Sequence, residues 1–132
     1  MGGAAVLSTI CRAPSPRGSP TTSFLEATAL AKPVEGKQNV ATVLAAASAI
    51  YQSIEFTAES QNAATTYLQW RATAFGGLQI AGITILERHA SGKIVAAAIH
   101  HRPVGAVLRF SAEIRDRLVG VIPADHFLME SA

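Results

Sequence analysis

The sequence has few of the residues from which metal centres and disulfide frameworks are built. Its 132 residues include one cysteine, Cys11, which excludes an internal disulfide and a zinc site made of cysteines. Aspartate occurs only at Asp116 and Asp125, so paired aspartates for acid–base catalysis are missing from most of the chain. There is no His-Glu-x-x-His motif either, and we expect no metal site.

Charge and long apolar runs are also scarce. Charged residues make up 15% of the chain and the formal net charge is +2, without a basic block, which argues against a nucleic-acid partner. No apolar run reaches the roughly 18 residues of a membrane span. Neither glycine-rich nucleotide-binding motif is present, and we expect no cofactor. The missing export signal predicts a cytoplasmic protein, and the alanine-rich composition favours a bacterial source.

Hydrophobic residues, at 49%, suffice for one folded domain. Residues 1–22 are rich in Pro, Ser and Gly, and we expect them to form a disordered tail. The predicted domain covers residues 23–122, and residues 123–132 are expected to form a C-terminal tail.

Hydrophobic periodicity predicts two helices and five strands in this domain. Hairpins join the later strands, which indicates an antiparallel sheet and the α+β class. In chain order we expect a strand at 24–30, a helix at 37–51, strands at 54–59, 65–75, 78–88 and 93–102, and a helix at 104–121.

Two groups stand out as candidate functional residues. His100 and His101 are adjacent on a predicted strand, so only one of them enters a given pocket, where it would titrate near neutral pH. Arg71 is a permanent charge in the middle of a strand, and it needs a partner or an anionic ligand if it faces inward. If it faces outward, it is an ordinary arginine of the sheet surface.

Three stretches resemble the nuclear transport factor two-like superfamily, which includes SnoaL-like polyketide cyclases, ketosteroid isomerases and limonene epoxide hydrolases. Residues 24–36 look like the family's first strand, its proline-containing loop and the glycine that opens the next helix. Residues 78–88 are similar to its glycine-containing central strand. Ser91-Gly-Lys-Ile-Val95, running on to His101-Arg-Pro103, resembles its last turn and strand. Together they cover roughly residues 23–120.

The resemblance implies a strongly curved antiparallel sheet wrapped around helices into a cone, with a ligand cavity inside and dimerisation through the sheet. Members of the family usually begin with two helices that close the cone. Residues 1–22 are too short and too rich in proline to supply both, so we expect these N-terminal helices to be short or absent.

The family's catalytic acids are not matched. The base of the isomerases falls at Ala27, beside Glu26, and their second acid falls near Thr84. The arginine of the epoxide hydrolases plausibly matches Arg71, but the acid position two residues further on holds Thr73, and the acid of the last strand falls near Ile99.

The Arg71 match implies which side chains face the cavity, and it places His101 inward and His100 outward. The catalytic candidates are then His101 and Arg71. The candidate ligand-binding residues are Glu26, Tyr67, Gln69, Thr73, Gly82, Thr84, Leu86 and Ile99. A register error of one residue would reverse these orientations.

Three functions remain open. The first is a SnoaL-like domain that binds a small apolar molecule without a catalytic carboxylate set. The second is a small cyclase, isomerase or hydrolase that uses a histidine and Arg71. The third is a dimerisation module. A homodimer is expected in each case, because the same orientation turns the apolar side chains of Leu68, Trp70 and Ala72 outward.

Overall fold

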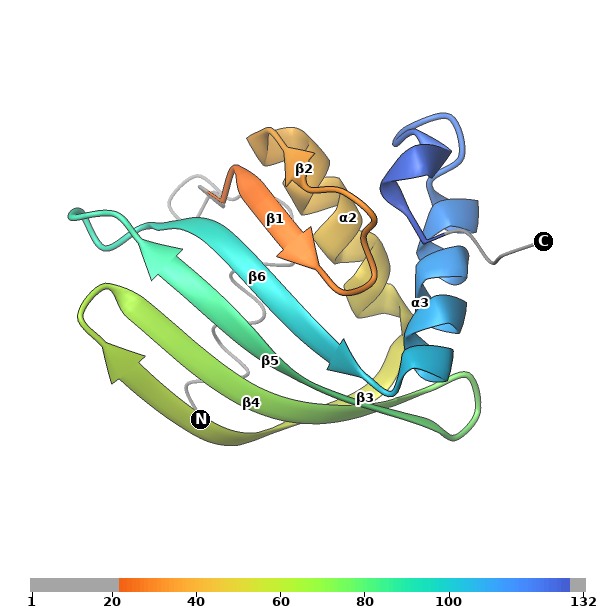
Figure 1. The fold of residues 1–132 in the computed structure, drawn as a ribbon, viewed down its shortest axis with the longest axis horizontal. Coiled ribbons are helices and arrows are strands. Elements are labelled where there is room, and N and C mark those ends of the chain that lie inside the picture. The colour runs from red at the N-terminus through yellow and green to blue at the C-terminus, as the bar shows by residue number, and fades with distance from the viewer. Residues whose placement is uncertain (1–21, 129–132) are drawn as a thin grey trace.

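The computed structural model describes residues 22–128, which form a curved sheet with two helices (Figure 1). The elements are β1 (Phe24–Ala27), β2 (Val34–Glu35), α2 (Lys37–Ile50), β3 (Tyr51–Asn62), β4 (Thr65–Ala74), β5 (Leu78–Arg88), β6 (Ile94–Arg102), α3 (Val104–Arg117) and a short 3₁₀ turn, η1 (Ala124–His126). The predicted α+β class is confirmed. The expected disordered tail lies outside the described residues, except for Thr22.

The six strands form one sheet in the order β2-β1-β6-β5-β4-β3. Strands β3 to β6 are an antiparallel meander, as their hairpins predict. In contrast, β1 runs parallel to β6, so the sheet is mixed rather than purely antiparallel. Sequence pattern did not show this pairing, because the two strands are far apart in the chain. The sheet is not closed, since β2 and β3 form its two edges.

Both helices cover the same face of the sheet, which we call the inner face (Figure 1). Gly36 precedes α2 with a φ of +96°, a conformation that L side chains rarely adopt, and so fixes where the helix begins. Helix α3 ends at Arg117 rather than near residue 121, because Gly120, at φ +82°, turns the chain away. The core between helices and sheet includes Val40, Leu44, Leu68, Trp70, Leu86, Val107, Phe110 and Ile114.

Strand β4 faces the opposite way from our expectation. Leu68, Trp70 and Ala72 are buried on the inner face, whereas Arg71 lies on the outer face with 65% of its side chain exposed. There its Nε lies 3.1 Å from Oε1 of Glu55 on the neighbouring β3. Burying an indole is favourable and burying a guanidinium is costly, which explains this orientation.

The packed domain continues past residue 122, where we expected a tail to begin. Phe127 is fully buried and forms a β-bridge with Leu30. The backbone N–H of Leu128 donates a hydrogen bond to Oγ of Ser111 on α3, at 2.9 Å. The segment after α3 is thus part of the core. In the part of the chain described, neither helix is long and apolar enough to cross a membrane.

Candidate functional site

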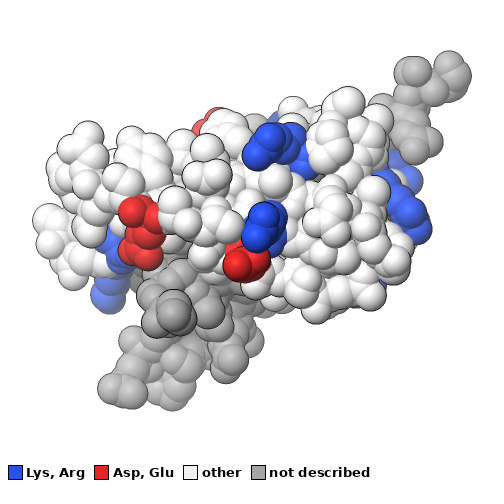
Figure 2. Space-filling view, turned by 90° about the horizontal axis from the view of Figure 1, so that it is seen from below, with Lys and Arg blue, Asp and Glu red and all other residues white. Residues whose placement is uncertain are grey.

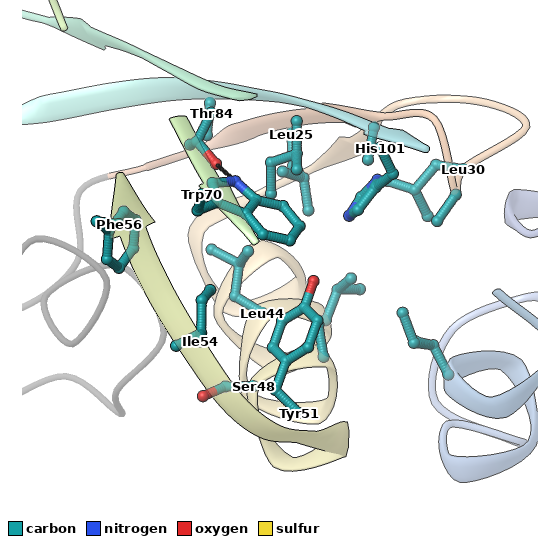
Figure 3. Close-up of a pocket in the computed structure, with 17 residues that line it drawn as sticks. Leu25, Leu30, Leu44, Ser48, Tyr51, Ile54, Phe56, Trp70, Thr84 and His101 are labelled. Atoms are coloured by element: carbon teal, nitrogen blue, oxygen red, sulfur yellow. Dashed lines mark hydrogen bonds between the residues drawn. The ribbon is translucent and has the colours of Figure 1, made fainter. Parts of the chain in front are cut away.

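A cavity lies between the inner face of the sheet and helix α2 (Figure 3). Its volume, counted as the space open to the centre of a water-sized sphere, is about 50 Å³. The lining residues with polar groups in their side chains are Ser48, Tyr51, Trp70, Thr84 and His101. The remaining wall is apolar, and none of the described residues that line the cavity carries a carboxylate, ammonium or guanidinium group. Its larger apolar side chains are Leu25, Leu30, Val43, Leu44, Ile54, Phe56, Ile99 and Ile114.

One row of residues across three strands shapes the polar end of the cavity. Trp70 on β4 pairs with Gly82 on β5, which pairs with His101 on β6. A Cβ atom on Gly82 would lie 2.7 Å from Cζ2 of Trp70 and would overlap the carbonyl oxygen of His100. Because Gly82 has no side chain, the rings of Trp70 and His101 meet above it edge to face, with centroids 5.5 Å apart.

The indole of Trp70 is held by a buried hydrogen bond. Its Nε1–H donates to Oγ1 of Thr84 at 2.9 Å (Figure 3). This bond satisfies a donor that would otherwise be costly to bury, and it fixes the orientation of the ring.

His101 is a buried, neutral histidine. Its backbone N–H donates to Oγ1 of Thr28, but Nδ1 of its ring is buried without a hydrogen-bond partner. Burial, and to a smaller extent the nearby charge of His100, lowers the pKa of His101 to about 4. The imidazole is therefore uncharged at neutral pH.

Tyr51 completes an aromatic group at this end of the cavity. Its ring stacks on Phe110 of α3 with centroids 5.1 Å apart and meets Trp70 edge to face at 5.7 Å. Figure 3 shows the Tyr51 hydroxyl and a ring nitrogen of His101 pointing toward the same space. The aromatic end, which we define as Tyr51, Trp70 and His101, combines flat apolar surfaces with polar atoms.

The structure brings together only part of the predicted site. Thr84, Ile99 and His101 line the cavity, although their function in binding stays a prediction. Leu86 is buried in the core and does not line it. Gly82 lies buried beneath the indole. Glu26 is exposed on β1 and does not line the cavity.

Four residues that we predicted to face the cavity lie on the outer face of the sheet. The inner-facing residues of β4 alternate with Tyr67, Gln69, Arg71 and Thr73, so these four side chains point away from the cavity. Arg71 and His101 therefore do not converge on one ligand. Residues that the sequence reasoning missed include Trp70, Tyr51 and the α2 residues Leu44, Ala47 and Ser48. The apolar periodicity of the helix and the single tryptophan in an alternating strand were the signals that could have found them.

In the described part of the chain, no group of three or more His, Cys, Asp or Glu side chains could hold a metal ion. No family model matches the sequence, and no curated protein matches it.

Solved structures do match. A steroid delta-isomerase from Pseudomonas aeruginosa has 20% identity and a TM-score of 0.70, covering 86% of this chain and 80% of its own. A putative isomerase of the SnoaL-like family from Agrobacterium tumefaciens has 14% identity and a TM-score of 0.55, covering 76% of this chain and 94% of its own. A de novo designed protein with a curved β-sheet has 15% identity and a TM-score of 0.62, and the match covers 82% of this chain and 92% of the designed chain.

At these identities the likeness shows the fold. The curved six-stranded sheet, the two helices on its inner face and the structural match to SnoaL-like proteins agree. The chain has the cone fold of the nuclear transport factor two-like superfamily.

Proposed function

We propose that this protein binds a small apolar molecule in the cavity between the sheet and α2, without a catalytic carboxylate set. The observation that carries the proposal is the cavity itself, whose wall is mostly apolar, includes no Asp, Glu, Lys or Arg and holds a single, uncharged histidine. Ligand sites commonly have this composition, with an apolar wall and a few convergent polar groups.

The alternative of an enzyme that uses His101 and Arg71 has little support. The two side chains belong to opposite faces of the sheet. A general base is most effective when its pKa lies near the working pH, and the pKa of His101 is lowered to about 4. The imidazole is better suited to hydrogen bonding than to proton abstraction at neutral pH.

Toluene is a suitable first probe, because it is small, apolar and uncharged. We expect it to shift the methyl NMR signals of the cavity wall in a saturable titration. Ala97 lines the cavity and is 2% exposed, so Ala97→Leu fills part of the space and should weaken binding at least tenfold. The next residue, Ala98, lies on the outer face, and Ala98→Leu is the matched control that should bind normally.

Absence of toluene binding to the wild type would overturn the proposal, and so would equal binding to Ala97→Leu. The dispersion of the methyl spectrum shows whether each variant is folded, so a loss of fold is distinguished from a filled cavity.

We also propose a homodimer formed through the outer face of the sheet, in a bacterial cytoplasm. Leu68, Trp70 and Ala72, which the sequence predicted for this contact, are buried inside the domain. A different apolar patch on the outer face must therefore form the dimer interface. Ile83 and Tyr67 are 43% and 37% exposed, and Ile85 lies between Tyr67 and Ala98 in the strand register. Figure 2 shows acidic and basic side chains scattered among uncharged residues on the side seen from below. Sedimentation should give a dimer that Ile83→Lys dissociates, and a monomeric wild type would contradict this.

A further inference from the structure

We propose, on the basis of the binding function above, that the ligand is a neutral molecule with one six-membered planar ring and a single hydrogen-bonding oxygen that pairs with the imidazole of His101. Four observations carry this: the size of the cavity, its lack of charged side chains, the rings at its aromatic end and the ring nitrogen of His101 that points into it.

The size of the cavity limits the ligand to one ring. A water molecule needs roughly 10–15 Å³ of this kind of volume, so about 50 Å³ holds roughly three to five water molecules. A benzene-sized body matches that space, whereas a fused polycyclic body exceeds it.

The absence of charge around the cavity selects a neutral ligand. The described lining residues include no Asp, Glu, Lys or Arg, and the one histidine is uncharged at neutral pH, so neither a cation nor an anion would find a counter-charge. The burial that keeps the imidazole of His101 uncharged would disfavour an ionised ligand for the same reason, because the charge would lose its hydration.

The aromatic end favours a planar ring. Tyr51, Trp70 and His101 present ring surfaces to the cavity, and their mutual contacts hold them in place. Aromatic pairs gain from offset or edge-to-face contact beyond the apolar area that they bury. A flat ligand can therefore contact several of these surfaces, which a puckered aliphatic ring of similar volume does less well.

The imidazole of His101 accounts for the single oxygen. The donor of Trp70 is already used by Thr84, whereas His101 lines the cavity and one of its ring nitrogens points into it (Figure 3). A polar atom that faces an apolar cavity gains from a hydrogen-bond partner, and the oxygen of the ligand can supply one. A neutral imidazole has one donor and one acceptor nitrogen, so either a hydroxyl or a carbonyl oxygen can pair with it.

Phenol and toluene test this inference, because they differ only in a hydroxyl against a methyl group. Their affinities are compared as a ratio, which cancels the general effects of a variant on the cavity. In His101→Phe the preference for phenol over toluene should fall about threefold to tenfold relative to the wild type, as expected for the loss of one hydrogen bond. His100→Phe is the matched control. That side chain lies on the exposed outer face, and the ratio should stay unchanged.

A second measurement uses the wild type alone and covers the case in which His101→Phe does not fold. In protein labelled with ¹⁵N at histidine, phenol should shift the ring nitrogen signals of His101, and toluene at the same occupancy should shift them much less. If toluene and phenol bind with the same ratio in His101→Phe and in the wild type, or shift these signals equally, the inference is wrong and the binding function stands. If neither compound binds the wild type, both proposals fail.

Discussion

Gly82 makes room for the aromatic end of the cavity. It is the middle residue of the row Trp70, Gly82 and His101, and any side chain at this position would collide with the indole. The geometry of two ring side chains on neighbouring strands therefore depends on a residue that contributes no side chain of its own.

Replacing Gly82 by alanine should displace the indole of Trp70. The added methyl group would lie 2.7 Å from Cζ2, and overpacking of this kind costs about 1–3 kcal/mol of the free energy of unfolding. Urea denaturation measures this change, and the tryptophan emission spectrum reports the displaced ring. Gly105→Ala is the control, because a Cβ at Gly105 meets nothing within 4 Å and α3 should gain slightly in stability. Unchanged stability and emission in Gly82→Ala would contradict this account.

His101 should make the stability of the fold depend on pH. Its pKa is about 4 in the folded chain, against the ordinary histidine value of 6.5, so the unfolded chain takes up a proton first as the pH falls. The free energy of unfolding should be unaffected above pH 6.5, fall as the pH drops from 6.5 to 4, and lose up to about 3 kcal/mol from this group.

The variant His101→Phe isolates this effect, because all other titrating groups stay in place. Denaturation at several pH values between 4 and 7 should show a smaller loss of stability in the variant than in the wild type. Equal losses in the two proteins across this range would show that the imidazole is not held neutral by the fold.

At the scale of elements, the positions of most strands and helices follow from local pattern, whereas the direction in which they face does not. The alternation of apolar and polar residues along β4 predicted the first and last residues of this strand to within one residue. Which side faces inward depends on where α2 and α3 pack, and this is decided by contacts distant in sequence. Paired residues of neighbouring antiparallel strands share a face, and Arg71 pairs with Ala81 rather than Gly82. An inward-facing Arg71 therefore conflicts with an inward-facing Gly82. The two positions are one residue out of register, so they belong to opposite faces of the sheet.

The same reasoning explains which site residues could be found. The inner-facing residues of β5 and β6, Thr84, Ile99 and His101, follow from alternation within their own strands. Tyr51 and the α2 side chains enter the cavity only because the helix packs across the sheet, and no local signal specifies that crossing. The parallel pairing of β1 with β6 is likewise a contact between distant parts of the chain.

Neighbouring residues of β4 should respond very differently to truncation. Trp70→Ala removes a buried ring and should cost about 3–5 kcal/mol of the free energy of unfolding. Arg71→Ala breaks only an exposed ion pair with Glu55 and should cost less than about 1 kcal/mol. Chemical denaturation of both variants gives the comparison. A larger cost for Arg71→Ala would mean that the strand faces the other way.

At the scale of the whole molecule, the fold leaves the function open. A steroid isomerase and a designed protein with a curved β-sheet share this architecture with the chain at 20% and 15% identity. Proteins with one fold can differ in activity, so function has to be argued from the site. Here the site is a small cavity without Asp, Glu, Lys or Arg and with one buried histidine whose pKa is lowered, and these features favour the proposed binding over acid–base catalysis.

The most direct test of the proposed binding is to locate bound toluene by NMR. Intermolecular nuclear Overhauser effects should join its protons to the methyl groups of Leu25, Leu44 and Ile99, which line the cavity. Ile83 and Ile85 serve as internal controls, because they belong to the outer face of the same sheet. Contacts to the first group alone would place the ligand between the sheet and α2, as the account predicts. Contacts to the outer isoleucines, or none at saturating toluene, would contradict it.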